Sequence, residues 1–262
     1  MINRLSNMMF WLILVTVFTV AGCWGKKDRL AIEPKDEPMA FMTDYASGAI
    51  KATGGQQAWM NTKKIEFDTV VTFYKPDGSF YLTEHHYEIY PWSNSIRISA
   101  AEPQGKFVWE LSKRGTKKAR QRYIGDAFPS ELYGKQYFTE LMLDTTTAPV
   151  RLLDKMVAFS KEPKPVKLEG LWYYPINRAA PAKRHGGIEP YWSKAVFYQR
   201  AETSLIDMVW FSDIEPGKFL VARGYDYKEI EKGGILVPMK IEIFKTDAPG
   251  VLKERLVKID LK

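Results

Sequence analysis

Cysteine is almost absent from this chain of 262 residues, and Cys23 is its only one. An internal disulfide is therefore impossible, and the fold must be held together by its core. Histidine is scarce as well, with His85, His86 and His185 as the three copies. A zinc site needs three or four suitably spaced ligands, and adjacent histidines on a strand point to opposite faces. We therefore expect no metal site and no cofactor.

Motifs of common catalytic sites are missing too. There is no Gly-x-Ser-x-Gly elbow and no glycine-rich phosphate loop. Glu84 and Glu88 flank His86 on one face of an expected strand, where they could support acid–base chemistry. A cross-strand polar ladder is the better interpretation of these three residues. The sequence thus predicts a protein that is not an enzyme.

The apolar run at residues 8–20 is too short to span a bilayer comfortably. It follows Arg4 and ends in small residues, which is typical of a secretory signal. The ending Val20-Ala21-Gly22-Cys23 resembles the lipobox of bacterial lipoproteins. This resemblance implies a signal peptide at residues 1–22 and lipidation of the Cys23 thiol, with acyl chains such as palmitate. The alternatives are an exported protein with a chance cysteine and an uncleaved anchor.

Charge indicates a membrane surface as partner. The formal net charge of +7 is modestly basic and suits anionic lipid. An exported lipoprotein would rarely meet nucleic acid, so we expect no nucleic-acid partner. The densest basic cluster, residues 113–122, is interpreted as a solvated hairpin tip. Residues 23–38 are charged and contain prolines, which predicts a flexible tether before the folded domain at 39–262.

Hydrophobic periodicity predicts a mainly β (α+β) domain. Helices are expected at 39–53 and 56–62, with Gly54-Gly55 ending the first, and at 130–143, with another helical turn at 149–156. Strands are expected at residues 65–73, 80–90, 95–101, 106–112, 118–123, 166–174, 195–199, 204–211, 218–227, 235–244 and 252–261. Residues 177–190 are expected to form a long loop. Such an antiparallel sheet either closes into a barrel or curls, with the helices as a plug or lid.

A family resemblance favours the second arrangement. Residues 45–59, in which a helix ends in Gly-Gly before a tryptophan, are followed by the first strand at 63–67. This opening, together with the final strands at 234–244 and 255–261, resembles the lipoprotein-sorting factors LolA and LolB. The resemblance implies a curved antiparallel incomplete β-barrel, with helices plugging or covering a concave side that receives acyl chains.

Alternating aromatic residues supply the candidate site. Phe67, Phe73, Trp109 and Trp210 have the strand parity of a hydrophobic cavity wall facing the concave side, with the helix around 132–143 as a lid. Plain sheet core gives the same pattern, so periodicity leaves both interpretations open.

Two functional hypotheses follow. The first is a membrane-anchored lipoprotein that binds a lipid, acyl chain or other hydrophobic ligand in the cell envelope, with lipoprotein or lipid trafficking as one use. The alternative is an envelope protein-interaction or sensor module without a small ligand, docking through a sheet edge or the basic hairpin. In the lipoproteins of enteric bacteria that this leader resembles, Asp after the lipidated cysteine commonly retains the protein in the inner membrane. Trp24 follows Cys23 here, so the resemblance implies the outer membrane, facing the periplasm.

Overall fold

The computed structural model describes residues 42–102, 105–112, 120–124, 132, 134–154, 157–179, 194–215, 218–230, 234–248 and 251–262. The chain divides into two units, residues 1–32 and 33–262, and every described residue belongs to the second. The predicted signal peptide, the tether and Cys23 therefore lie outside the described residues. So do residues 113–119 of the basic cluster and 180–190 of the predicted loop.

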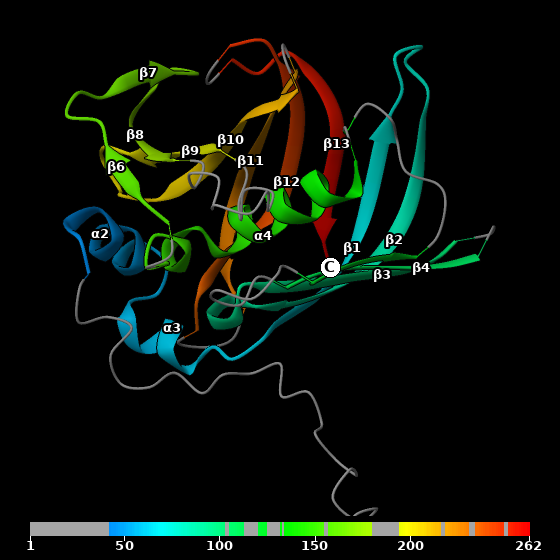
Figure 1. Ribbon diagram of the computed structural model, residues 1–262, viewed down its shortest axis with the longest axis horizontal. Coiled ribbons are helices and arrows are strands. Elements are labelled where there is room, and N and C mark those ends of the chain that lie inside the picture. Colours follow the sequence, from blue (N-terminus) through cyan, green and yellow to red (C-terminus); the bar gives the residue numbers. More distant parts are fainter. Residues whose placement is uncertain are drawn as a thin grey trace, which may run out of the picture. The chain divides into compact units, whose positions relative to one another are not determined.

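One antiparallel sheet of thirteen strands forms the body of the domain (Figure 1). Its order is β5-β4-β3-β2-β1-β13-β12-β11-β10-β9-β8-β6, and β7 pairs with β8. The strands are β1 (Ile65–Tyr74), β2 (Phe80–Tyr90), β3 (Ser95–Glu102), β4 (Gly105–Ser112), β5 (Arg120–Ile124), β6 (Phe159–Lys161), β7 (Val166–Leu168), β8 (Leu171–Arg178), β9 (Ala195–Arg200), β10 (Ile206–Glu215), β11 (Lys218–Glu229), β12 (Leu236–Thr246) and β13 (Glu254–Leu261). Among the described residues no pairing joins β5 to β6, so the sheet is open, as the sequence predicts.

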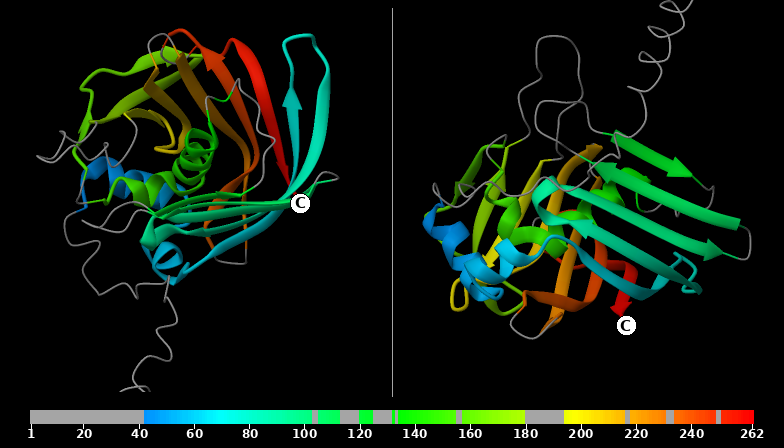
Figure 2. Two further views of the ribbon diagram at one scale, coloured as in Figure 1. Left: turned by 45° about the vertical axis from the view of Figure 1, so that its right-hand side comes forward. Right: turned by 90° about the horizontal axis from the view of Figure 1, so that it is seen from below.

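Four helical elements of the described residues accompany this sheet, and α4 lies inside its curve. They are α2 (Asp44–Ala52), α3 (Gln56–Asn61), the short 3-10 helix η2 (Pro91–Ser93) and α4 (Lys135–Arg151). Helix α4 runs inside the curve and packs on β3, β4, β10 and β11, as the two views of Figure 2 show. Its residues are buried from Phe138 to Arg151. The curved sheet and the helix therefore share one apolar core. Within the described part of the chain, no helix combines the length and apolarity needed to cross a membrane.

Strand β1 illustrates how the sequence builds the sheet. Ile65, Val71 and Phe73 are buried on one face, with Phe67 half-buried beside them, as their period of two predicts. The hairpin to β2 pairs residues Tyr74↔Phe80 through Ile65↔Ile89. These contacts set the register of the curled sheet.

Helix α2 ends where glycine is required. Gly54 has φ +112°, and an added Cβ would lie 2.7 Å from the carbonyl oxygen of Gly234. Trp59 of α3 donates its indole Nε1–H to Thr53 Oγ1 at 2.8 Å and is fully buried. The predicted end of the first helix at Gly54-Gly55 is thus confirmed.

The middle of the chain differs from the sequence expectation in three places. The expected strand at 166–174 is split into β7 and β8 by a turn in which Glu169 and Gly170 both have positive φ. Strand β6 was not predicted, because three residues are too few to show a period. The separate helical turn expected at 149–156 is instead part of α4, which continues through Pro149.

A kink at Thr147 permits α4 to continue. Its φ of −114° is not helical, and Pro149 lacks the N–H that would bond one turn back. The hydroxyl of Thr147 donates to the carbonyl of Leu143 at 2.6 Å, which satisfies a group near the disturbed turn.

Candidate functional site

Three of the four predicted ligand-contacting residues belong to the core that α4 shares with the sheet. Phe73 and Trp109 are buried, and their ring centroids lie 6.4 Å and 6.0 Å from that of Phe138 on α4. Phe67 is half-buried and stacks on Tyr87 at 5.1 Å. The helix expected as a lid therefore packs directly on this part of the concave face. Whether these residues contact a ligand stays a prediction.

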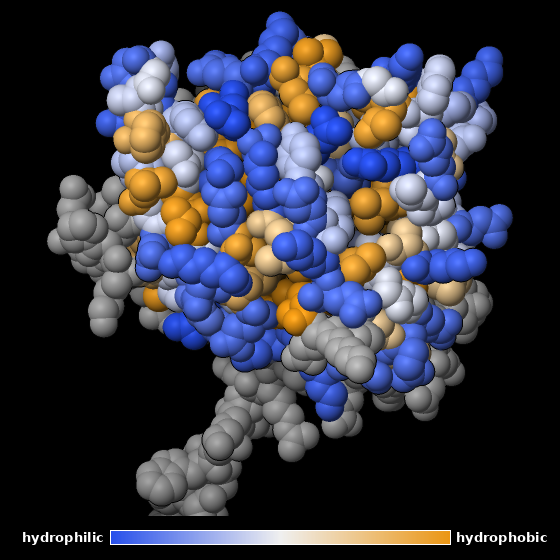
Figure 3. All heavy atoms as spheres, turned by 180° about the vertical axis from the view of Figure 1, so that it is seen from behind, coloured by the Kyte–Doolittle hydropathy of each residue, from blue (hydrophilic) through white to orange (hydrophobic). Residues whose placement is uncertain are grey.

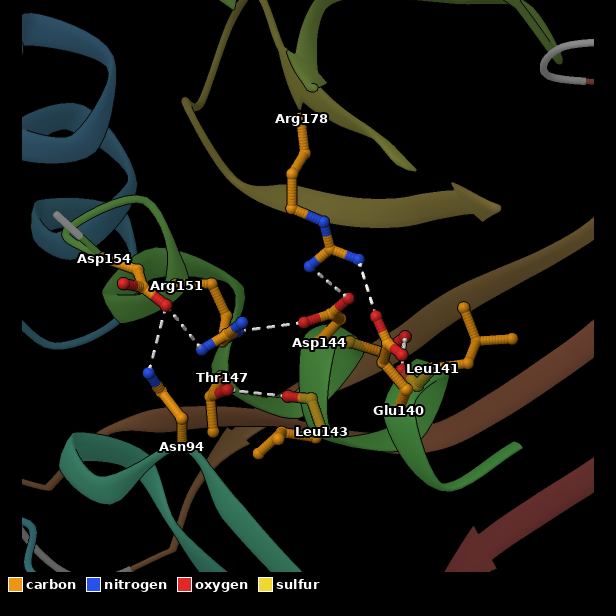
Figure 4. A network of polar contacts seen from close by, with 10 residues as sticks. Asn94, Glu140, Leu141, Leu143, Asp144, Thr147, Arg151, Asp154 and Arg178 are labelled. Carbon is orange, nitrogen blue, oxygen red and sulfur yellow. Dashed lines mark hydrogen bonds and ion pairs between the residues drawn. The ribbon is translucent and has the colours of Figure 1, made fainter. Parts of the chain in front are cut away.

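A buried ionic network joins α4 to the sheet (Figure 4). Arg178 on β8 reaches Glu140 with Nη2 at 3.1 Å and Asp144 with Nη1 at 2.7 Å. Arg151 donates from Nε to the other oxygen of Asp144 at 2.9 Å. The side chains of Asp144 and both arginines have no exposed surface. Oppositely charged side chains that are buried away from water attract each other strongly. Loss of one partner destabilises the fold, because the other charge stays buried without compensation.

Aromatic rings surround the same arginine. Its guanidinium carbon lies 5.4 Å from the ring centroid of Phe197 and 5.7 Å from that of Phe211. Both rings contribute cation–π attraction in addition to the ion pairs. The guanidinium group of Arg178 on β8 therefore contacts both α4, through the ion pairs, and the rings on β9 and β10.

His85 is a buried titratable group that sequence reasoning missed. It lies among Phe73, Phe107 and Trp109, and its Nε2 is 2.6 Å from Thr83 Oγ1. The only sign of this burial in the sequence was that His85 alternates in phase with apolar residues of β2. His86 points to the other face of the strand, where its Nδ1 lies 2.8 Å from Asp68 Oδ1. The predicted opposite orientation of the two histidines and the polar ladder are thus confirmed. Burial lowers the pKa of His85 to about 3.

This pKa predicts a loss of stability in acid. The unfolded chain protonates His85 near pH 6.5, whereas the folded chain resists protonation down to about pH 3. The unfolded state thus binds more protons between these values, and stability falls as pH decreases through the window, by up to about 4 kcal/mol at its lower end. Urea unfolding from pH 7 to pH 3 should show this slope in the wild type and a shallower one in His85→Phe. His86→Phe, on the solvent side of β2, is the control; an equally steep slope in His85→Phe would contradict the assignment.

Trp210 does not join the other three predicted residues. Its neighbours Val209 and Phe211 face the core shared with α4, and Trp210 packs in a second cluster on the opposite face of the sheet. The expectation that all four residues share the concave side is therefore not met by Trp210. On β10 both faces are buried, so strand parity gave no sign of which face was inner.

A cavity that is partly open to solvent lies beside the second cluster. Across the sheet, Trp210 on β10 lies opposite Val196 on β9 and Val221 on β11. The cavity has a volume of about 280 Å³. It is lined by Val166 and Leu168 of β7, Pro175 and Asn177 of β8, Val196 and Tyr198 of β9, and Trp210. Since none of these side chains is ionisable at neutral pH, the cavity suits a neutral, apolar group.

A charged cluster occupies the next row of the same face. Arg200 on β9 donates from Nε to Asp207 Oδ2 at 2.7 Å, and Tyr173 donates its hydroxyl to the same oxygen at 3.4 Å. Burial raises the pKa of Asp207, and the nearby Arg200 opposes that rise. Arg200 and Asp207 pair with each other and neither lines the cavity, so the cavity wall has no charged side chain.

The outer surface also carries an exposed apolar hairpin. Phe80 and Leu82, on β2 just after the turn, are 60% and 59% exposed. Tyr74 on β1 lies beside them, with its ring centroid 6.2 Å from that of Phe80. Seen from behind, the molecule shows apolar side chains in several separate places among polar ones (Figure 3). The hairpin is thus one of several exposed apolar areas.

The fold and these two faces define the class of protein: an open, curved antiparallel sheet wrapped around a helix. No family model and no curated protein matches the chain. Among solved structures it is similar to a LolA superfamily protein from Nitrosomonas europaea, at 9% identity and a TM-score of 0.49, covering 83% of this chain and 91% of that one.

Two further solved structures are similar. An outer membrane lipoprotein-sorting protein domain from Vibrio parahaemolyticus has 10% identity and a TM-score of 0.41, covering 76% of this chain and 83% of that one. A DUF1329 family protein from Desulfovibrio piger has 12% identity and a TM-score of 0.43, covering 83% and 90%. Two of the three names coincide with the family that the sequence resembles. At these TM-scores the likenesses carry no functional argument.

Proposed function

We propose that this protein is a membrane-anchored lipoprotein of the cell envelope that binds a lipid, an acyl chain or another hydrophobic ligand. It acts by binding and not by catalysis, at the outer membrane and facing the periplasm, and lipoprotein or lipid trafficking is the process it would serve. The observation that carries the proposal is the apolar cavity of about 280 Å³ beside Trp210. That volume is slightly below the roughly 300–1,000 Å³ of small-ligand sites, so it suits one end of an apolar chain.

The concave and outer faces of the sheet differ in what must move before a ligand can bind. On the concave face, α4 occupies the space above Phe73 and Trp109, and the pairs of Arg178 with Glu140 and Asp144 fasten it there. A ligand on that face must displace α4 and disrupt buried charge pairs. The outer cavity needs no such displacement. Burial of apolar ligand surface there supplies about 25 cal/mol per Å² before the costs of association.

A fatty-acid probe whose fluorescence depends on its environment tests the proposal. We expect it to bind the full chain in lipid nanodiscs above the level seen with empty nanodiscs. Trp210→Ala should weaken probe binding more than it lowers stability, because a cavity wall has fewer packing partners than a filled core. Trp109→Ala is the matched control: it should lower the free energy of unfolding by about 3–5 kcal/mol and leave binding to the folded fraction intact.

The opposite result would favour the alternative, an interaction or sensor module. That result would be that the folded wild type binds no probe and that Trp210→Ala lowers the free energy of unfolding by several kcal/mol. The specific observation in favour of this alternative is the exposure of Phe80 and Leu82 on the β1–β2 hairpin. Large apolar side chains exposed together are typical of contact surfaces. In that case Phe80→Ser with Leu82→Ser should reduce site-specific cross-links from the hairpin to an envelope protein, with stability unchanged.

A further inference from the structure

The tip of the β1–β2 hairpin carries a run of exposed apolar side chains. Phe80, Tyr81 and Leu82 are 60%, 37% and 59% exposed, whereas the other large exposed apolar residues in the described part of the chain are separate from one another in the sequence. Strand β3 pairs with β2 only from His86 to Tyr90, so the half of β2 that holds the run extends past β3. The hairpin therefore projects from the sheet (Figure 1).

The exposed apolar area of this hairpin is small. Tyr81 stacks on the buried ring of Phe73 at 5.0 Å, whereas Phe80 and Leu82 lie on the outer face, where Phe80 is opposite Tyr74. The exposed parts of the three side chains amount to about 300 Å², since an aromatic side chain buries roughly 150–250 Å². A stable protein–protein interface takes about 800 Å² from each partner. The size and projection of the hairpin therefore favour shallow insertion among lipid headgroups.

A basic band, formed by Arg223, Lys240 and Arg255, lies on the same outer face. Glu242 on β12 is 3.1 Å from Lys240 Nζ and 2.9 Å from Arg255 Nη1 on β13. The side chain of Glu242 is only 7% exposed, whereas those of Lys240 and Arg255 are 30% and 42% exposed. Arg223 on β11 is opposite Glu242 in register, and its Nε has no hydrogen-bond partner. Because several cations share one nearly buried carboxylate, the band presents positive charge to solvent.

The basic band adjoins the hairpin. The guanidinium carbon of Arg255 lies 4.6 Å from the ring centroid of Tyr74, which belongs to the hairpin. Farther along β1, the same face carries the exposed carboxylates of Glu66 and Asp68, which flank His86. Positive charge is therefore concentrated at the end of the outer face that holds the exposed apolar side chains. An anionic surface would attract this end in preference to the other.

We propose that the β1–β2 hairpin and the basic band form a second membrane contact, which sets the outer face of the sheet against an anionic phospholipid surface. Phe80 and Leu82 insert among the headgroups, with the ring of Tyr74 at the interface, where its hydroxyl stays hydrated. Lys240 and Arg255 contact lipid phosphates. The inference rests on the proposed function, because the lipid anchor holds the domain close enough for a weak contact to form. It adds the orientation of the domain and the lipid charge that it recognises.

Photo-cross-linking from the hairpin tests this contact. The full chain, with p-benzoylphenylalanine at position 82, is held by its own anchor in nanodiscs of phosphatidylcholine alone or mixed with phosphatidylglycerol. We expect at least about fivefold more lipid adducts in the anionic nanodiscs, since each basic residue near such a surface contributes about that factor. The same label at Trp172, which is 48% exposed on β8, is the control and should give few lipid adducts in either nanodisc.

Charge substitutions test the basic band separately. Arg223→Gln with Lys240→Gln, which leaves Arg255 to pair with Glu242, should reduce lipid adducts at position 82 by at least about fivefold in the anionic nanodiscs. Lys51→Gln with Lys167→Gln is the matched control. It removes the same charge from exposed positions on α2 and β7 and should leave the adducts unchanged.

The outcomes distinguish this inference from the proposed function. If the chain stays with the nanodiscs but position 82 gives no more lipid adducts than position 172, the second contact is overturned and the anchored function stands. Adducts that are independent of phosphatidylglycerol and of the band would overturn the recognition of anionic lipid. Adducts to a protein instead of lipid in envelope vesicles would support the interaction module. If the chain does not stay with the nanodiscs, the proposed anchoring fails and the inference fails with it.

Discussion

Arg178→Met should lower the free energy of unfolding by about 3–5 kcal/mol. The substitution removes the cation that pairs with Glu140 and Asp144 in a fully buried setting, and it leaves those carboxylates short of positive charge. Removing one partner of a buried pair has this cost because the other charge remains desolvated. Methionine retains an apolar chain against Phe197 and Phe211, so the loss reports mainly on charge. Urea unfolding at neutral pH measures the change.

Arg97→Met is the matched control. Arg97 lies 3.5 Å from Glu88 and from Glu110, but its side chain is 49% exposed. Exposed pairs contribute about 0–1 kcal/mol, so this variant should lose little. Adding Glu140→Gln to Arg178→Met should recover part of the loss, because it removes one of the uncompensated charges. If Arg178→Met lost no more than Arg97→Met, the network would not be what fastens α4 to the sheet.

Cys23→Ser should abolish membrane attachment. The prediction rests on the lipobox resemblance, in which the cysteine sulfur carries diacylglycerol and the new amino terminus is acylated. Each buried methylene contributes about 0.8 kcal/mol, and two or more acyl chains together anchor a protein stably. Serine lacks the thiol, so the chain should remain an uncleaved precursor or become soluble.

Metabolic labelling with palmitate, followed by membrane fractionation, measures the effect of Cys23→Ser. Wild type should carry label and sediment with membranes, and the variant should carry none. Equal incorporation of label in both chains would show that the lipobox interpretation is wrong. Deletion of the hydrophobic leader at residues 1–22 gives the reference for a chain that is never exported.

Local features of the fold follow from the sequence with good accuracy. The expected strand at 80–90 coincides with β2, and those at 65–73 and 95–101 each differ from the observed strands by one residue. The stop at Gly54-Gly55 is likewise observed. Such features depend on alternation, turn residues and caps within a few residues of each other, and a single sequence displays these directly. The open curved sheet came from adding a family resemblance to this pattern.

Contacts between distant segments could not be obtained in this way. The partners of Arg178 lie on α4. The hydrophobic periodicity of the sequence predicts neither that α4 continues through Pro149 nor that it packs near β8. The burial of His85 depends on Phe107 and Trp109, which reach it only after β2, β3 and β4 pair in register. Sequence alone therefore gave neither the charge network nor the lowered pKa.

The same distinction between local pattern and long-range contact applies to the candidate site. Sequence alone determined that aromatic residues would alternate along the strands and that Cys23 follows a hydrophobic leader. Only the tertiary structure decided which face each aromatic residue occupies, placing Phe73 and Trp109 against α4 and Trp210 beside the outer cavity. The physical reason is that parity fixes a side chain's face relative to its own strand. Which face becomes the inner one depends on how the whole sheet curls and on where the helix packs.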